Sequence, residues 1–547
     1  MKQTNTKNIF WIPVIVLFLI GFLLGIIGFK EGFWNGIYKT VQMFMLHEKF
    51  EKGMNPCLQW SRWILLFVFV VAAFQLFITI VAPRLIRYAL IRFFYRNHII
   101  ICGLNKITIN LVKKYSRKQI VVLAEETNKH AETLKAKNVK LLIGDFADES
   151  FWEKAKLKKA SKLYAFIDND KINVKIAKFA FSYLKNREKN NALKCFVLIK
   201  DREMKPILEE LPLFKNKSDY FEGTLFNINE MGAKYGIAMN IDKILPAKMT
   251  TAPEILLVGL TEKTEVVLLN LAHCLTMQRE TFKFTIVEND TEKIRLFEKQ
   301  CNKLHLREFA EMEITNHNLE KICTEKTFNS ILICTENQTE AIKQSIEIHY
   351  ILGRSAPNII VFCRDADTFN TILKEEMEKK KIFPIILFEE IADYIFKFDN
   401  SKGSKCIEEM AEDAHNIWRK KDEDDNFVEN DTYDTLSEHF KQTNRNQVID
   451  NFLRAFIARG KTFGELGKNT LFDLKENEKE TLAIIEHRRW IIEKYDNGWI
   501  YDEKRDNNFK RHTDLRVWEK LSKSDKEKDE KIINLMINFI NNQKNEC

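Results

Sequence analysis

Two long apolar runs dominate the first hundred residues. Residues 9–29 and 63–82 carry hardly any polar side chain, and each run is long enough to cross about 30 Å of hydrocarbon as a helix. Lysines precede the first run, and the second is closely followed by Arg84, Arg87, Arg92 and Arg96. Because cationic flanks stay on the cytoplasmic side, we expect a multi-pass protein of the inner (plasma) membrane with both termini in the cytoplasm.

Between these runs lies a short amphipathic segment, residues 33–46, which ends before Gly53–Pro56 break the chain. One interpretation is an interfacial helix on a simple two-helix anchor, and the other is a pore-like assembly. The order of long, short and long helix resembles that of two-span potassium channels, in which a TVGYG-type filter follows the short helix. Here HEKFEKGMNP follows instead, so we expect no potassium filter.

From residue 97 onward, short β-branched runs alternate with helical segments. The predicted strands of a first domain, residues 97–250, are His98–Cys102, Ile120–Ala124, Val139–Ile143, Leu163–Ile167 and Cys195–Lys200. The pattern recurs in a second domain, residues 251–400, with strands at Glu254–Val258, Phe282–Val287, Asn329–Cys334 and Asn358–Cys363. Strands that alternate with helices in this way predict two tandem, doubly wound α/β (Rossmann-like) domains with parallel sheets.

Several landmarks of a nucleotide-binding fold occur in order in the first domain. A glycine turn follows the first strand, an acid ends the second strand, and two polar pairs follow the third and fourth; we take as site residues Gly103, Asn105, Thr108, Glu125, Gly144, Asp145, Asp170 and Asn173. This succession resembles the TrkA-N, or potassium-conductance regulator (RCK), family. The resemblance implies a ligand such as NAD(H), ATP or ADP, bound by a sensor and not by an enzyme.

The glycine turn is degenerate, because Asn105 and Thr108 stand where the pattern has its second and third glycines. Their side chains would fit a dinucleotide less closely, although a helix N-terminus still favours an anion. A bound nucleotide and an empty, structural sheet both remain open. The second copy of the turn, Gly259 to Thr264, is weaker still, because Glu262 would repel a phosphate, and a structural role is favoured there.

The C-terminal part divides into a helical linker region, residues 401–479, and a final segment, residues 480–547. The pattern H-x-x-W, GW-x-Y, R-D and K-x-H in that segment supplies His487, Trp490, Trp499, Tyr501, Arg505 and His512. It resembles the repeat domain of ryanodine receptors (RyR), a mostly α module. These residues could form an aromatic, cationic ligand pocket or simply the core of a small helical domain, and both interpretations stay open.

Composition narrows the functional classes. The 85 basic and 77 acidic residues are interspersed, so nucleic-acid binding is not expected. The ten cysteines lack any CxxC pair, which disfavours a metal site. We find no credible catalytic motif and expect no catalytic residues and no enzyme activity.

Together these features favour a homo-oligomeric (tetrameric) receptor-effector or channel-like protein that is gated by a cytosolic nucleotide or nucleotide second messenger. Its domain combination resembles predicted effectors of antiviral defence. The alternatives are a membrane-anchored NAD(P)-dependent oxidoreductase and a scaffold that forms no channel.

Overall fold

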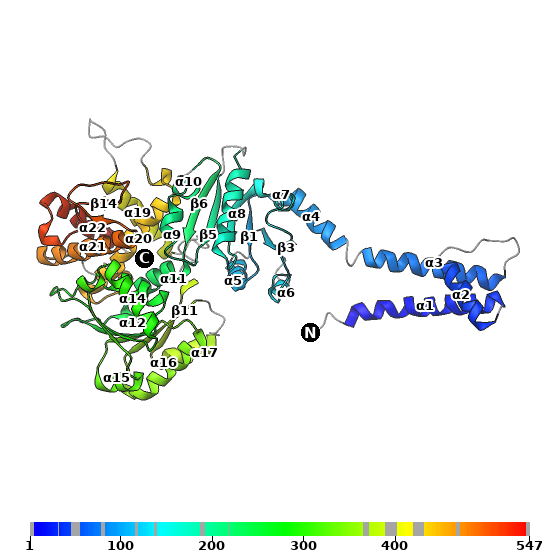
Figure 1. The fold of residues 1–547 in the computed structure, drawn as a ribbon, viewed down its shortest axis with the longest axis horizontal. Coiled ribbons are helices and arrows are strands. Elements are labelled where there is room, and N and C mark those ends of the chain that lie inside the picture. The colour runs from blue at the N-terminus through cyan, green and yellow to red at the C-terminus, as the bar shows by residue number, and fades with distance from the viewer. Residues whose placement is uncertain are drawn as a thin grey trace. The chain divides into compact units, whose positions relative to one another are not determined.

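The computed structural model describes residues 5–30, 32–44, 55–77, 82–114, 119–135, 139–185, 192–216, 218–364, 371–388, 402–419, 432–466 and 471–542. The chain forms two compact units, Met1–Tyr95 and Arg96–Cys547 (Figure 1). The segment after the short N-terminal helix, residues 45–54, lies outside the described residues, as does most of the charged stretch from 419 to 432.

The N-terminal unit is helical. It holds α1 (Asn5–Phe29), α2 (Phe33–Phe44), α3 (Pro56–Leu76) and α4 (Ala82–Phe94). By length and composition, Pro56–Gln75 could cross a membrane, and Val14–Phe29 with Phe33–Gln42 would make a second crossing if this pair, bent by 120°, counts as one. Helix α3 thus starts before residue 63, where the apolar run that predicted it begins, because Pro56 and the N-cap Asn55 set its first turn.

Glycines allow the N-terminal helices to approach closely. A Cβ at Gly21 would lie 2.9 Å from Ile64, and one at Gly28 would lie 2.6 Å from Leu58. The Ser61 hydroxyl on α3 donates to the Gly21 carbonyl at 2.6 Å. Small residues and buried hydroxyl contacts are typical of helix pairs that pack within a membrane.

The first sheet is parallel, with strand order β3-β2-β1-β4-β5-β6. Its strands are β1 (His98–Cys102), β2 (Ile120–Ala124), β3 (Lys140–Ile143), β4 (Ala160–Ala165), β5 (Leu193–Leu198) and β6 (Phe221–Phe226). Its helices are α5 (Lys106–Lys114), α6 (His130–Lys135), α7 (Glu149–Lys154), α8 (Asp170–Tyr183), α9 (Lys205–Glu209), α10 (Pro212–Lys215), α11 (Ile228–Met239) and α12 (Ile241–Ile244).

The second sheet repeats this order as β9-β8-β7-β10-β11-β12 and is also parallel. Its strands are β7 (Glu254–Val258), β8 (Lys283–Val287), β9 (Glu311–Thr315), β10 (Ser330–Ile333), β11 (Asn358–Cys363) and β12 (Ile382–Ile386). Its helices are α13 (Glu262–Leu271), α14 (Thr291–Lys303), α15 (Leu319–Glu325), α16 (Gln338–Leu352) and α17 (Thr371–Lys379). The predicted tandem of doubly wound α/β domains is confirmed.

The C-terminal region is mostly helical, as predicted. It holds α19 (Lys402–Trp418), α20 (Glu438–Arg459), α21 (Glu476–Asp496), β13 (Ile500–Tyr501), β14 (Arg511–His512) and α22 (Lys523–Asn542). One buried apolar cluster runs from Ile99 in β1 to Ile540 in α22 and includes residues of both sheets. The second unit therefore has a continuous core, and its domains are not independent bodies on linkers.

Candidate functional site

The glycine turn of the first domain is closed by its own side chains. Gly103 has φ +112°, and a Cβ there would lie 2.8 Å from the Phe166 carbonyl, so only glycine fits. Asn105 accepts from the Thr108 amide at 3.0 Å and donates to the Phe166 carbonyl at 2.5 Å. Its carboxamide thereby takes an amide at the start of α5 that a phosphate would otherwise use.

The other predicted residues of the first domain mostly hold backbone. The Thr108 hydroxyl donates to the Gly103 carbonyl at 2.9 Å. Buried Asn173 accepts from the Ile167 amide and donates to the Ile167 and Leu198 carbonyls, and Asp170 accepts from the Lys200 and Asp201 amides. Gly144 packs against the Phe151 ring, Asp145 accepts from the Ala147 amide, and Glu125 is exposed at the end of β2. Of these residues, the exposed carboxylates Glu125 and Asp145 are the ones that the described contacts leave open, at least in part, to a ligand.

The second domain closes its turn in the same way. Thr261 donates to the Cys334 carbonyl at 2.6 Å, and Thr264 donates to the Gly259 carbonyl at 2.5 Å, matching Asn105 and Thr108 in the first copy. In addition, Glu288 accepts from the Leu260 amide at 2.9 Å. Burial opposes ionisation of Glu288, but three backbone amides outweigh it and lower its pKa.

The cleft above this turn has a volume of about 560 Å³. Among the described residues, Lys293 is the one lysine or arginine that lines it, against five glutamates: Glu288, Glu320, Glu336, Glu340 and Glu347. A phosphate would meet carboxylates there, which agrees with the structural role expected for this copy.

In the C-terminal domain, four of the predicted residues form an aromatic cluster, in which His487 stacks on Trp490 with ring centroids 5.8 Å apart. The His512 ring stands edge-on to Trp490, with ring centroids 4.9 Å apart, and to Trp499, 6.0 Å apart. His487 is buried and fixed, because its Nε2 lies 2.9 Å from the Arg516 carbonyl and its Nδ1 lies 3.2 Å from an Asp529 oxygen. It therefore serves the fold more than it serves a ligand.

The remaining two predicted residues lie at the edges of this cluster. Arg505 is exposed and its Nε donates to the Asn507 side chain at 3.1 Å. Tyr501 is 45% exposed and lines a different cavity.

Lys494 is a site residue that the sequence interpretation missed. Its Nζ lies 4.9 Å from the Trp499 ring centroid and 5.8 Å from that of Trp490. Burial lowers its pKa first, and the nearby Arg489, Arg505 and Lys510 lower it further against the opposing effect of Glu493. Within the described part of the chain Lys494 has no ion pair. The Lys494 ammonium is thus desolvated, surrounded by like charges and placed against two tryptophan rings. An anion with a planar ring would stabilise it, because the negative charge would pair with the ammonium and the ring would stack on a tryptophan.

A buried polar junction joins this domain to both sheets. Arg202, which follows β5, pairs with Glu265 on α13 at 3.4 Å and with Asp496 at the end of α21. Burial raises the pKa of both carboxyl groups, and Arg202 opposes that rise. One guanidinium therefore touches all three domains of the second unit.

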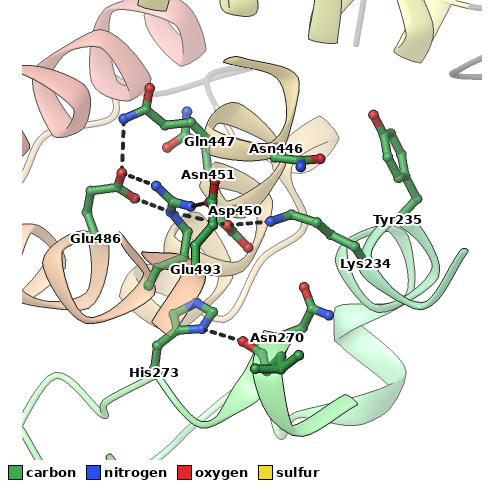
Figure 2. Close-up of polar contacts among 12 residues, drawn as sticks. Lys234, Tyr235, Asn270, His273, Asn446, Gln447, Asp450, Asn451, Glu486 and Glu493 are labelled. Carbon is green, nitrogen blue, oxygen red and sulfur yellow. Dashed lines mark hydrogen bonds and ion pairs between the residues drawn. The ribbon is translucent and has the colours of Figure 1, made fainter. Parts of the chain in front are cut away.

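Figure 2 shows the deeper part of this junction, where Asp450 faces Lys234 and Glu486 lies beside Gln447. The Lys234 ammonium lies 3.3 Å from an Asp450 oxygen, and Arg489 lies 3.5 Å from the same atom. Glu486 pairs with Arg489 at 2.8 Å and with Arg454. Burial favours the neutral form of Glu486, but the two guanidiniums outweigh it and lower its pKa to about 2.

His273 reaches the same junction from the second domain (Figure 2). It is 1% exposed, its Nδ1 lies 3.3 Å from the Leu269 carbonyl, and burial lowers its pKa to about 4. A cavity of about 190 Å³ lies beside these groups and is bounded by all three domains. Its ion pairs hold the three domains against one another, so we interpret the junction as a contact that couples them.

Comparison with known proteins places two domains in this chain. Residues 99–214 match the TrkA-N domain, and residues 468–544 match the RyR domain. No curated protein matches the chain.

Among solved structures, the chain is similar to three of GsuK. They are a GsuK point mutant (13% identity, covering 71% of this chain and 96% of that chain, TM-score 0.38), GsuK bound to ADP (12%, 73% and 100%, 0.39) and the GsuK channel bound to NAD (11%, 72% and 84%, 0.40). Likenesses at these scores carry no argument about function. The domain matches do stand: this chain carries a TrkA-N domain and, near its C-terminus, an RyR domain.

Proposed function

We propose that this protein is a membrane-anchored receptor whose cytoplasmic unit binds a nucleotide or nucleotide-derived anion at the RyR domain. The observation that carries the proposal is Lys494, held without an ion pair among the described residues and against the faces of Trp490 and Trp499. Guanidinium and ammonium groups suit phosphate, and tryptophan faces suit a base. Because the glycine turns of both α/β domains are closed by their own side chains, these turns are the weaker candidates for the ligand site.

In this proposal the α/β domains receive the signal and pass it on. The junction of Arg202, Asp450 and Glu486 links the RyR domain to both sheets through buried ion pairs. β1 follows α4 after three residues, so a shift in the first sheet pulls directly on the chain that leads to the candidate membrane helices. Ligand binding then changes the state of these helices by differential affinity for two packings.

The proposed effector is an oligomer, because one pair of long helices cannot enclose a path for ions. A tetramer would place eight α/β domains below the membrane, with both termini in the cytoplasm. The chain acts by binding in this proposal and catalyses nothing. Oxidation of added NADH by the purified protein, with any candidate substrate, would favour the oxidoreductase alternative instead. A role in antiviral defence is consistent with a sensor that permeabilises the membrane when a nucleotide signal appears.

Tryptophan fluorescence of the full-length protein in detergent tests the binding step. Titration with ADP, NAD and cyclic dinucleotides should give saturable quenching with at least one of them, since Trp490 and Trp499 flank Lys494. Lys494→Gln should weaken that ligand about tenfold or more, because a hydrogen bond to a charged group contributes about 1.5–3 kcal/mol. Lys504→Gln, on the neighbouring exposed loop, is the matched control and should bind normally. Equal affinity in both variants would exclude the RyR domain cluster as the sensor.

A further inference from the structure

A further cavity lies along α21, between the RyR domain and the second α/β domain. Its volume is about 570 Å³. One wall comes from α21, with Ile484, Arg488, Ile491 and Tyr495 at helical spacing, and the facing wall comes from residues 275–309. None of Trp490, Lys494 and Trp499 lines this cavity, so the two sites differ, although His487 lies between them, lining the cavity and stacking on Trp490.

Arg488 is the central cation of this cavity. Its Nε donates to the His273 carbonyl at 2.9 Å, and its Nη2 donates to the Ala272 carbonyl at 3.2 Å and to the Phe309 carbonyl. Burial lowers its pKa to about 10. In the part of the chain that the structure describes, no carboxylate lies within ion-pair distance of Arg488 and its Nη1 has no acceptor. The guanidinium is therefore fixed in place by carbonyls while its charge stays uncompensated.

The rest of the lining is also rich in cations, one of which, Arg279, pairs with Glu480 at 2.5 Å. The cavity has four cationic side chains, Arg279, Arg488, Arg516 and Lys520, against two carboxylates, Glu308 and Glu519. The Nε of Arg516 is buried and has no acceptor among the described residues. Aromatic rings complete the walls: Phe309, under the Arg488 guanidinium at 5.2 Å, with Tyr495, Tyr501 and Trp518.

We infer that this cavity binds an anion that carries a planar ring, of the nucleoside phosphate class, with its phosphate on Arg488 and its ring against the aromatic walls. A space of this size holds a small-molecule ligand. Guanidinium donors match phosphate oxygens, and aromatic faces match a base. Such a ligand would bridge the RyR domain and the second α/β domain and so hold them in one packing. The inference shares its ligand class with the proposed function but does not need the membrane helices to respond.

Photo-crosslinking with an azido-adenine derivative of ADP tests this site in the full-length protein. Mass spectrometry should locate saturable labelling within residues 308–309 or 515–520, which line this cavity and not the Trp490–Trp499 cluster. Arg488→Gln should weaken labelling about tenfold or more. Arg295→Gln removes an exposed arginine of α14 that pairs with Glu292, and it should leave labelling unchanged.

Arg488→Gln also leaves three carbonyls without a donor, so a second variant guards against misfolding. Val517→Trp adds bulk at an exposed wall residue, keeps Arg488, and should block labelling to the same extent. Lys494→Gln should leave this labelling intact. No saturable labelling in these segments, labelling that survives both Arg488→Gln and Val517→Trp, or labelling lost in Lys494→Gln alone would each overturn the inference. This experiment measures no ion flux, so its result does not depend on whether the membrane helices respond to the ligand.

Discussion

Glu486 offers the sharpest test of the buried junction. It is fully buried on α21, and the guanidiniums of Arg454 and Arg489 hold its pKa at about 2 instead of 4.5. A shift of this size corresponds to about 3 kcal/mol of stabilisation at neutral pH, at about 1.4 kcal/mol per pKa unit. Breaking a buried ion pair on one side typically costs about 3–5 kcal/mol, which agrees.

Glu486→Gln should therefore open α20 and α21 locally. Hydrogen–deuterium exchange of the full-length protein should show amides in these helices exchanging about 100-fold faster than in the wild type at pH 7. Glu476→Gln on the same helix is the control, because Glu476 is 89% exposed beside Lys479 and should change exchange hardly at all. Adding Arg454→Met to Glu486→Gln should restore part of the protection, since one unpaired cation is removed.

The pH dependence follows from the sign of the shift. A depressed carboxyl pKa gives stabilisation that is fully present above 4.5 and disappears as pH falls through about 2. The difference between wild type and Glu486→Gln should accordingly shrink as the pH is lowered below 4.5. If the amides of α20 and α21 in Glu486→Gln exchange at pH 7 within about fivefold of their wild-type rates, the view that this carboxylate couples the two helices is refuted.

Three further predictions follow from single residues. His273 is buried with a pKa of about 4, against 6.5 in the unfolded chain, so its contribution to the free energy of unfolding should fall by about 3 kcal/mol between pH 6.5 and pH 4. The urea midpoint of His273→Gln should therefore fall less over this range than that of the wild type, and parallel curves for the two proteins would contradict this. Gly103→Ala should lower stability by about 1–3 kcal/mol because of φ +112° and the Phe166 carbonyl at 2.8 Å, measured by thermal melting; an unchanged midpoint would be inconsistent with the strain. Asn105→Gly should free the Thr108 amide and strengthen ADP binding at the glycine turn of the first domain, whereas Asn105→Thr, which introduces the residue of the second copy, should not. Equal heats of ADP binding for the two variants in calorimetry would leave the turn without a ligand role.

The sequence predicted the fold well except at the sheet edges. Within the two α/β domains, the three strands that it missed, β6, β9 and β12, are all edge strands. Edge strands tolerate residues that weaken a strand pattern: β6 contains Gly223, β9 has two glutamates, and β12 contains Pro384. The central strands, which are buried on both faces, read as continuous apolar runs and were found close to their observed bounds.

The candidate sites were less predictable, because side-chain partners far apart in sequence decide them. The pattern identified Trp490, Trp499 and His512, which do come together, but gave no sign that Lys494 would lie between tryptophan faces. Asn105 reads as a degraded glycine, and only its bond to Phe166 shows that it closes the turn. The three-domain contact of Arg202 joins residues almost 300 positions apart, beyond the reach of local spacing.

The most direct test of the account is ion flux through liposomes that carry the full-length protein, measured before and after ADP, NAD or cyclic dinucleotides are added to the cytoplasmic side. The account predicts that at least one of them changes the flux and that Lys494→Gln abolishes this response while Lys504→Gln retains it. Flux that is identical with and without every nucleotide, from protein shown to be inserted and folded, would contradict the claim that a ligand in the cytoplasmic unit controls the membrane helices.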